Sequence, residues 1–486
     1  LTLLPVLTLR AASALTWVAL AANAIGVTSL SWVGVALAFV VFCTPVGRLP
    51  IGAWGARLIR GKAAPGVYPR GGATHLRLWA AEKWLAASGA LNVSAANLNK
   101  VTARMLGNRV GKGVDLQALP PVSGLLTIGE GAAVEPGVDM SGYWLDGDEL
   151  HVGEVSIGPD ARVGARSTLM PGTEIREGAH VEAGSTVTGA KPVKKHARWA
   201  GSPARKVGRS KLRFPDERPP ARRGWVPVYA IVSLLIGLVP LLAIAAGAAV
   251  VAAAGKYWLL AAPLGGLVYL GVGLGLTWLG VRVAQLPVRP GVFPVRSAPG
   301  LGLWATTRLL DDARTRYFPI YASMLTPVWF RSLGADVGEK AEISTAVMVP
   351  RLSHVRAQSF LADDTLIGAY ELGHGWIRTD TATVGKRAFV GNSGMVAPGR
   401  KLAKESLVAV LSASPKKSKA GSNWWGSPPE RMRRVEVEAG GDEATFEPTQ
   451  ALRRKRGLVE TLRLLAPMTQ GVLAAVFGFA ALRLLE

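Results

Sequence analysis

The chain has 486 residues, which requires several folding units, and 49% of them are hydrophobic, which favours segments that cross lipid. Its single cysteine, Cys43, excludes a disulfide framework, and six scattered histidines predict no metal centre. The 56 Lys and Arg exceed the 33 Asp and Glu and give a formal charge of +23, but no zinc-finger, RNP or helix-turn-helix pattern accompanies it, so we expect no nucleic-acid partner.

Three apolar stretches divide the chain. The first, 11–46, would measure about 50 Å as one helix against a hydrocarbon core of about 30 Å, so we expect two spans with a turn near 23–26. The second, 226–285, predicts another pair, broken at 255–256, and the third, 458–485, predicts one further span. The lipid bilayer is therefore an expected partner.

Paired spans return the chain to the side it left, so the polar regions 49–225 and 286–457 share one side of the membrane. The turns inside each pair carry almost no charge, whereas basic clusters flank the spans in the polar regions. The positive-inside rule places those regions in the cytoplasm of a multi-pass protein of the cell (inner or plasma) membrane. The clusters are Arg57, Arg60 and Lys62; Arg209, Lys211 and Arg213; Arg218, Arg222 and Arg223; and Arg453, Arg454, Lys455 and Arg456.

A six-residue repeat of aliphatic side chains runs through the first polar region. Period six fits neither a helix nor an alternating strand, but it suits a parallel β-helix whose short strands each point one side chain inward and whose glycines allow positive φ at the corners. Three hexads make one coil, and stacked coils bury a continuous column. The positions are Val110, Leu116, Val122, Ile128, Val134 and Met140 and, after a gap of 17, Ile157, Val163, Leu169, Ile175, Val181, Val187 and Val193.

The second polar region repeats this pattern 227 residues later, with the gap of 17 at the same place, since 110 becomes 337 and 157 becomes 384. Upstream, Pro65-Gly-Val-Tyr-Pro69 matches Pro290-Gly-Val-Phe-Pro294. We interpret the chain as a duplicated unit followed by the start of a third, and as a piece of a longer polypeptide. The second set of positions is Val337, Ile343, Val349, Val355, Leu361, Ile367, Val384, Val390, Val396, Leu402 and Val408.

The predicted units follow from these two patterns in chain order. They are a helix pair (1–48), a partly helical connector (49–108), a first β-helix (109–225), a helix pair (226–285), a connector (286–335), a second β-helix (336–435), a linker (436–457) and a helix that begins a third unit (458–486).

Each gap contains 11 extra residues, which predict a loop projecting from the solenoid, where function is often placed. In the first loop, Asp146, Asp148 and Glu149 lie beside Tyr143 and Trp144, a set that suits a cationic amine through charge and cation–π contact. The alternative is a loop that only covers the coil with solvated acids.

A histidine follows or lies within each loop. His151 is a suitable general base for an amine or hydroxyl that attacks a thioester, because imidazole exchanges its proton near neutral pH. His374, beside Trp376, is the candidate of the second loop, but it aligns with Gly147, and His151 aligns with Arg378. The two loops therefore cannot share one set of catalytic residues. Three other histidines are expected to be surface groups: His180, His196 and His354.

A basic segment with tryptophan follows each coil, at 195–206 and 423–434. Trp199, Arg205, Trp424 and Trp425 are candidates for receiving a phosphopantetheine arm or an acidic carrier domain. The same residues equally suit a cap on the open end of the β-helix or a contact with the membrane interface. The sequence leaves both interpretations open.

These motifs resemble two known families. Hexads that close on Trp199-Ala-Gly-Ser-Pro-Ala-Arg205 resemble the hexapeptide-repeat acyltransferases, which implies a left-handed β-helix and a loop histidine as base. The alternation of paired spans and tandem coils resembles the membrane-embedded C-terminal region of epsilon-poly-L-lysine synthetase-like nonribosomal peptide synthetases. The implied fold class is a multi-domain membrane protein with tandem left-handed parallel β-helix (hexapeptide-repeat) domains alternating with pairs of transmembrane α-helices.

The second resemblance implies an enzyme that forms amide bonds between units of a basic amino acid such as L-lysine. Adenylation and carrier domains would lie upstream in cis and supply a phosphopantetheine thioester, the basic polymer would be a partner, and this region would need no cofactor of its own. The His-His-x-x-x-Asp-Gly motif of ordinary condensation domains is missing here. The alternatives are a CoA-dependent membrane acyltransferase of the hexapeptide-repeat class and a non-catalytic scaffold or export region.

Overall fold

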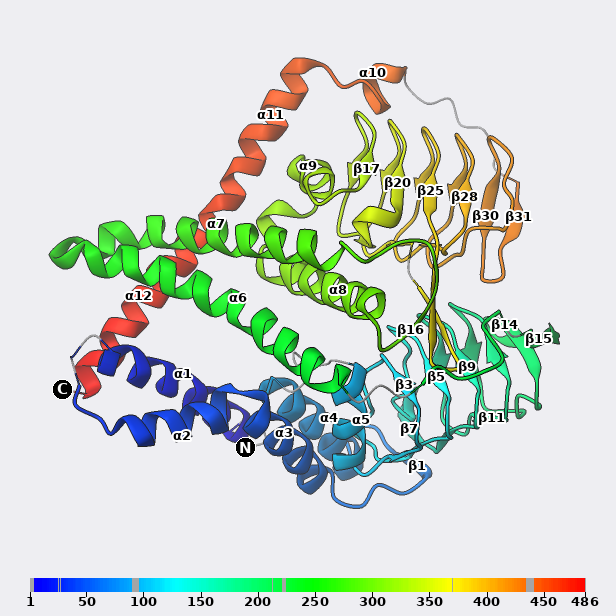
Figure 1. Ribbon diagram of the computed structural model, residues 1–486, viewed down its shortest axis with the longest axis horizontal. Coiled ribbons are helices and arrows are strands. Elements are labelled where there is room, and N and C mark those ends of the chain that lie inside the picture. The colour runs from blue at the N-terminus through cyan, green and yellow to red at the C-terminus, as the bar shows by residue number, and fades with distance from the viewer. Residues whose placement is uncertain are drawn as a thin grey trace. The chain divides into compact units, whose positions relative to one another are not determined.

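The computed structural model describes residues 4–24, 26, 28–89, 96–211, 213–220, 224–368, 370–433 and 441–485. The chain divides into two compact units (Figure 1). Unit 1 comprises Leu1–Arg218, Leu372–Gly375 and Phe477–Glu486, and unit 2 comprises Pro219–Glu371 and Trp376–Val476. Each unit contains apolar helices, a connector and a series of short parallel strands, which we call the first and the second stack.

The apolar helices of unit 1 differ from the expected pair in 1–48. Helix α1 (Leu4–Ala24) has the expected length, but α2 (Trp32–Cys43) has 12 residues, about 18 Å, which is short of the ~30 Å core. Helix α3 (Pro45–Arg60) starts directly afterwards, and the two helices meet at an angle of 51°. Proline has no backbone N–H to continue a helical ladder, so the break falls at Pro45.

The helices of unit 2 follow the sequence pattern closely. Helix α6 (Trp225–Ala253) and α7 (Trp258–Ala284) are separated by a 3₁₀ turn, η2 (Gly255–Tyr257), as predicted. They pack tightly, since a Cβ at Gly247 would lie 2.6 Å from the carbonyl oxygen of Gly265. The linker begins among residues outside the described ranges (434–440); after them come α10 (Asp442–Thr445), α11 (Gln450–Thr461), η5 (Leu462–Leu464) and α12 (Leu465–Leu485).

Within the described ranges, four helices are long and apolar enough to cross a membrane, or up to five if the bent pair α2–α3 is one span. This count rests on length and composition, and it is consistent with a membrane protein. Arg222 and Arg223, part of one predicted basic cluster, lie outside the described residues. The four spans are Leu4–Ala24, Pro227–Ala253, Gly255–Ala284 and Gln450–Arg483.

The connectors are helical with short irregular breaks. In unit 1, α4 (Ala73–Ala87) and α5 (Ala96–Met105) precede the first stack. In unit 2, α8 (Ala298–Arg316), η3 (Phe318–Ile320) and α9 (Leu325–Ser332) precede the second. The apolar sides of α3 and α4 form one core with part of the excursion from the first stack, through residues such as Leu78, Leu85 and Leu150.

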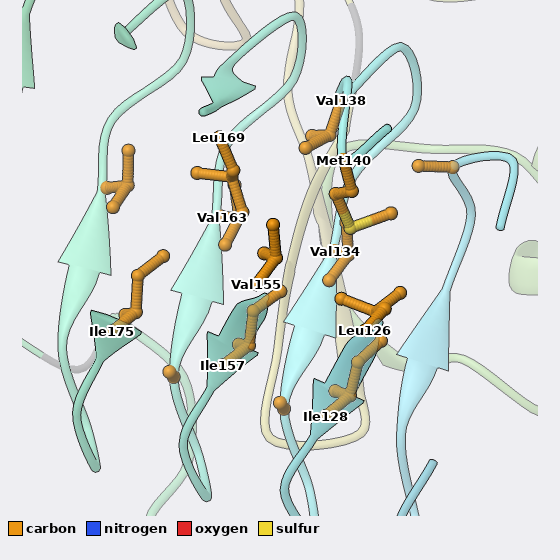
Figure 2. Close-up of a cluster of buried hydrophobic side chains, with 14 of the residues drawn as sticks. Leu126, Ile128, Val134, Val138, Met140, Val155, Ile157, Val163, Leu169 and Ile175 are labelled. Atoms are coloured by element: carbon orange, nitrogen blue, oxygen red, sulfur yellow. The ribbon is translucent and has the colours of Figure 1, made fainter. Parts of the chain in front are cut away.

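The first stack forms three ladders around a buried aliphatic column, and all pairs in them are parallel except the last one in the longest ladder (Figure 2). Partners are 18 residues apart, as in Ile157 opposite Ile175, except where the 11 extra residues intervene, as in Ile128 opposite Ile157. The expected inward positions are thereby confirmed, with the exception of Val122. The ladders are β2 (Arg109–Val110), β4 (Leu126–Ile128), β8 (Val155–Ile157) and β11 (Glu174–Ile175); β3 (Asp115–Leu116), β5 (Ala133–Val134), β9 (Arg162–Val163), β12 (His180–Val181), β14 (Ala197–Gly201) and β15 (Ala204–Arg209); and β10 (Thr168–Leu169) with β13 (Thr186–Val187).

The second stack repeats this arrangement, with Val355 opposite Val384 and Val384 opposite Leu402. In Figure 1 its strands follow one another along unit 2 from β17 to β31. The ladders are β17 (Asp336–Val337), β20 (Ser353–Val355), β25 (Ala382–Val384) and β28 (Lys401–Leu402); β18 (Glu342–Ile343), β21 (Phe360–Leu361), β26 (Phe389–Val390), β29 (Leu407–Val408), β30 (Asn423–Trp425) and β31 (Glu430–Met432); and β19 (Val347–Met348), β22 (Leu366–Ile367) and β27 (Met395–Val396).

One predicted position departs from the ladder, and it is the same position in both copies. Val122 belongs to the core shared with α3 and α4, outside the aliphatic column. At the equivalent place, Met348 takes the ladder position opposite Ile367, and Val349 is the residue before the 3₁₀ turn η4 (Pro350–Leu352). In each copy, the residue predicted to point inward at this corner of the first coil therefore does not take the ladder position.

Glycines in the first stack serve two different purposes. Gly178 has φ +62°, as expected for a corner. Gly164, which directly follows an inward valine, does not have positive φ; a Cβ there would lie 2.4 Å from the backbone nitrogen of Ala183 in the next coil. The glycine after the aliphatic residue is thus required by the close approach of successive coils.

Candidate functional site

The first excursion is a β-hairpin. Strands β6 (Tyr143–Asp146) and β7 (Glu149–Val152) pair antiparallel across a two-residue turn in which Gly147 has φ +54°. Upstream strand β1 (Gly66–Pro69) adds to the other edge of β7, with Gly66 opposite Val152. This third strand explains why the Pro-Gly-Val-aromatic-Pro motif recurs in both copies.

One face of this three-stranded sheet carries most of the predicted site. Because strand side chains alternate, Trp144, Asp146, Glu149 and His151 share the outer face, whereas Leu150 packs into the unit 1 core. Trp144 lies opposite His151 with ring centroids 5.7 Å apart. The Glu149 carboxylate lies 3.1 Å from His151 Nε2. Nε2 is buried and faces this carboxylate without a hydrogen bond to it or to any other described residue.

Tyr143 does not join this face, and Glu149 lies beside His151. The Tyr143 hydroxyl donates a hydrogen bond to the carboxylate of Glu82 on α4. Burial and this carboxylate raise the pKa of Tyr143. Asp146, Asp148 and Glu149 are all exposed, and binding of an amine by these acids stays a prediction.

The second excursion has the same strands but a different face. Strand β16 (Gly291–Pro294) pairs with β24 (Trp376–Thr379), with Gly291 opposite Thr379, and β23 (Glu371–Gly373) completes the sheet. Arg378 stands where the first hairpin has His151, and its Nη1 lies 2.8 Å from the carboxylate of Glu371, which replaces Trp144. An ion pair therefore occupies the place of the aromatic and histidine pair.

His374 lies in the hairpin turn with φ +57°, in the segment that belongs to unit 1. Its Nδ1 is 3.3 Å from the carboxylate of Asp160, and its Nε2 is 2.9 Å from the carbonyl oxygen of Asp216. Both ring nitrogens thus face oxygen acceptors. This geometry suits a positioning contact better than the base that the sequence predicted.

The tryptophans that follow each stack extend its ladders. Trp199 lies opposite Val181 and packs on the aliphatic column, and Trp424 lies opposite Val408. Each belongs to an antiparallel hairpin at the end of its stack, β14–β15 or β30–β31. Both tryptophans therefore lie at the end of their stacks, where a cap would stand. Arg205 and Trp425 are exposed, and a docking role for them stays a prediction.

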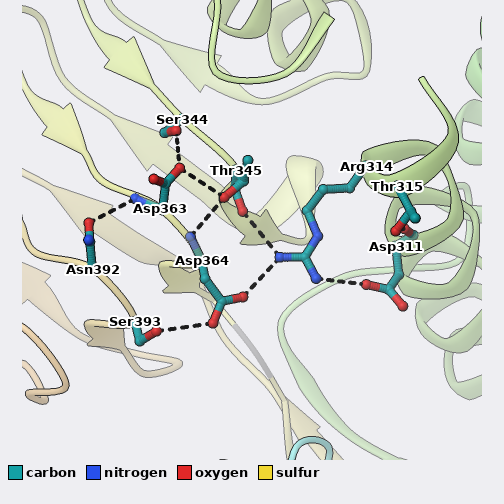
Figure 3. A network of polar contacts seen from close by, with 9 residues as sticks. All are labelled: Asp311, Arg314, Thr315, Ser344, Thr345, Asp363, Asp364, Asn392 and Ser393. Carbon is teal, nitrogen blue, oxygen red and sulfur yellow. Dashed lines mark hydrogen bonds and ion pairs between the residues drawn. The ribbon is translucent and has the colours of Figure 1, made fainter. Parts of the chain in front are cut away.

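A polar network fixes the connector of unit 2 to a corner of the second stack (Figure 3). Arg314 on α8 bonds Asp364 at 2.9 Å and Asp311 at 3.0 Å. Burial opposes the charge of Arg314, but its hydrogen bond to Asp364 raises the pKa of the guanidinium overall. The network is a structural clamp, and the remaining participants are Ser344, Thr345, Asp363, Asn392 and Ser393.

His180 was predicted to be an ordinary surface group, but it is half-buried between two arginines of its ladder, Arg162 and Arg198. Burial, followed by the charges of Arg162, Arg213 and Arg198, lowers the pKa of His180 to about 3. The 18-residue register predicts the ladder neighbours from sequence, but not the approach of Arg213. The described residues contain no group of three or more His, Cys, Asp or Glu suited to a metal ion.

The His180 environment predicts acid-dependent stability of unit 1. Because the pKa is 6.5 when unfolded and about 3 when folded, the stability contribution is complete above pH 6.5 and is lost as the pH falls toward 3. At about pH 5 the free energy of unfolding should be lower by roughly 2 kcal/mol. Thermal unfolding at neutral and acidic pH checks this. His180→Asn should have a visibly shallower acid loss, and an unchanged loss would contradict the assignment.

Parts of the chain resemble a family model and several solved structures. Residues 154–189 match the model described as the hexapeptide repeat of succinyl-transferase. Two solved structures resemble parts of the chain. A serine acetyltransferase from Brucella abortus strain S19 is 19% identical, covering 35% of this chain and 62% of that chain, with a TM-score of 0.22. A hexapeptide-repeat acetyltransferase from Vibrio cholerae is 16% identical, covering 25% and 86%, with a TM-score of 0.20.

The delta-poly-L-ornithine synthetase of Acinetobacter baumannii (strain AB307-0294) is similar over nearly the whole chain, with 28% identity over 480 residues and 91% of this chain. The chain spans about a third of that curated relative, 34% of its length. The chain therefore resembles a poly-amino-acid synthetase and contains hexapeptide units.

Proposed function

We propose that the chain is the amide-forming region of a membrane-bound, single-module nonribosomal peptide synthetase that polymerises a basic amino acid. The observation that carries this proposal is the similarity to a poly-ornithine synthetase across 91% of the chain. On this proposal the two stacks are tandem left-handed β-helices that alternate with membrane-spanning helices. The polar units lie in the cytoplasm, since basic residues flank the spans on that side.

The first hairpin supplies the chemistry in this proposal. The free amine of one amino acid attacks the carbonyl carbon of a thioester, a C–N bond forms, the C–S bond breaks and the thiol leaves. His151 accepts the amine proton at Nδ1, and the Glu149 carboxylate beside Nε2 stabilises the charged ring that results. Trp144 and Asp146 share that face and suit a second, cationic amino group of the substrate.

The second hairpin is not catalytic in this proposal. Arg378 and Glu371 neutralise each other at the equivalent position, and His374 is held by two oxygen acceptors. The second unit then serves to guide the basic chain or to dock a partner. Adenylation and carrier domains in cis are the expected source of the phosphopantetheine thioester, and this region holds no cofactor of its own.

The test offers the purified full-length synthetase two acyl donors, an aminoacyl thioester on its carrier domain and acetyl-CoA, each with lysine or ornithine. Mass spectrometry of the products should find amide-linked oligomers from the carrier thioester and no acetylated product. Acetyl transfer without oligomers would favour a CoA-dependent acyltransferase instead, the alternative that the succinyl-transferase repeat in residues 154–189 supports. If neither donor reacts, the chain is not the catalytic region.

A further inference from the structure

Both units carry two arginines at the same junction, where the last apolar helix ends and the strand stack begins. In unit 1 they are Arg57 and Arg60 at the end of α3, and in unit 2 they are Arg282 in the last turn of α7 and Arg351 in η4. Arg57 and Arg282 are equivalent by sequence, since the matching proline motifs begin at 65 and 290, 225 residues apart. Each lies against a glycine at the start of its stack, Gly107 or Gly334.

The second guanidinium is retained although its position in the sequence changes. In unit 1, Arg60 Nη1 donates to the carbonyl oxygens of Val122 at 2.9 Å and Leu106 at 3.2 Å. It occupies the space beside Gly124, where an added Cβ would lie 2.0 Å from Nη1.

In unit 2 the arginine stands at the position equivalent to Gly124, and the position equivalent to Arg60 has another residue. Gln285 stands in place of Arg60, and Arg351 stands in place of Gly124. Arg351 Nη1 donates to the carbonyl oxygens of Gln285 at 3.0 Å and Leu286 at 3.1 Å. The guanidinium therefore enters the junction from the opposite side, which indicates that two cations are needed there in both copies.

No carboxylate balances these cations in the part of the chain that the structure describes. None of Arg57, Arg60, Arg282 and Arg351 forms an ion pair among the described residues. In unit 2 the two arginines line a pocket of about 420 Å³ that has no acidic residue in its lining. Its other walls are largely apolar and include Val283, Leu286 and Leu333. Such a pocket suits an anion that carries an apolar group.

The pocket lies at the depth expected for lipid headgroups if α7 crosses the membrane. Arg282 ends the helix, and Trp278, one turn earlier, is 40% exposed and donates from Nε1 to the carbonyl oxygen of Ser332. Tryptophan at the end of an apolar helix is typical of the membrane interface. Val283 and Leu286 are 57% and 69% exposed beside the pocket.

We propose that each junction binds the phosphate of an anionic phospholipid, through Arg282 and Arg351 in unit 2 and through Arg57 and Arg60 in unit 1. The phosphodiester accepts hydrogen bonds from the guanidinium groups, and the glycerol and upper acyl chains lie on the apolar walls of the unit 2 pocket. The proposal rests on the membrane placement proposed above and is independent of the catalytic role of the first hairpin. On this proposal, a bound phospholipid helps to hold the end of the apolar helix against the strand stack in each unit.

The test uses the full chain reconstituted into mixed vesicles of phosphatidylcholine and phosphatidylglycerol, re-extracted in a neutral detergent. Mass spectrometry then counts the phospholipids that stay bound. Phosphatidylglycerol should be retained preferentially, and Arg282→Gln should lower its retention at unit 2 by about threefold to tenfold, as expected for the loss of a charged hydrogen-bonding partner. Arg57→Gln should lower retention further, and Arg282→Lys should restore part of it. Arg289→Gln is the matched control, because it removes the same charge from an exposed arginine outside the pocket.

Equal retention of the two lipids, or equal loss in Arg282→Gln and Arg289→Gln, overturns the proposal. Displacement of phosphatidylglycerol by inorganic phosphate alone also overturns it, because the site would then serve a soluble phosphate. If the chain is not recovered with the vesicles, the membrane placement fails and the lipid proposal fails with it. Oligomer formation by the same preparation reports separately on the proposed catalysis.

Discussion

On the proposed function, His151→Ala in the full-length protein should lower the rate of amide formation by about 10²- to 10⁴-fold, the usual contribution of a positioned general base. The ring is fixed by contacts on two sides, Trp144 at 5.7 Å between centroids and Glu149 at 3.1 Å from Nε2. Removing it leaves the three-stranded sheet intact, because Leu150 and Val152 hold the opposite face in the core of unit 1. The loss should therefore fall on the rate, with an unchanged melting temperature.

The duplicated hairpin provides the control for this experiment. Arg378→Ala changes the equivalent position of the second copy, where the ion pair with Glu371 is half-buried, and we expect a rate within about threefold of the parent. Glu149→Gln should have an intermediate effect and should change the dependence of rate on pH, since it alters the group that holds the histidine. Equal losses in His151→Ala and Arg378→Ala would show that neither residue is the base.

Ile175→Asp should prevent stable folding of the first stack. Ile175 is 1% exposed and lies in a ladder between Ile157 and Val193. A carboxylate at this place would have no hydrogen-bonding partner inside an aliphatic column, and we expect a loss of more than about 4 kcal/mol, which exceeds what a marginally stable unit tolerates. Thermal unfolding in detergent, with limited proteolysis of the stack, measures it.

The control for the column experiment is the preceding residue of the same strand. Glu174 points outward, is half-exposed and pairs with Arg176 at the surface, so Glu174→Ala should change the free energy of unfolding by less than about 1 kcal/mol. Similar losses in both variants would contradict the inward and outward alternation of the two residues. The two variants change neighbouring residues of one strand, so they differ only in whether the side chain points inward or outward.

The sequence pattern anticipated the column because one inward side chain per hexad is a strict geometric requirement. The pattern failed at Val122 and Val349. A six-residue repeat reports only the spacing of residues along the chain, and it cannot show that a connector packs against the first coil. It likewise missed the break before Pro45, since composition measures how apolar a stretch is and only the backbone chemistry of proline marks the interruption.

Within the candidate site, the identity of the residues was predictable and their orientation was not. The acids, Trp144 and His151 were found from charge and chemistry in one short loop. The loop had to be recognised as a hairpin before alternation could separate Tyr143 from Trp144. The alignment of Pro65–Pro69 with Pro290–Pro294 was the available signal, because a motif repeated upstream of each loop turned out to be the third strand.

The pairing of β1 with β7 joins segments on opposite sides of the connector and of two coils, with Gly66 opposite Val152. Contacts between such distant parts of a chain form late, because a long intervening segment must first be ordered. During synthesis the outer face that carries His151 is completed only after the preceding helices and coils of its unit have emerged. An incompletely synthesised unit would therefore lack a finished hairpin face, and any ligand of that face would meet it only on a chain already folded to that point.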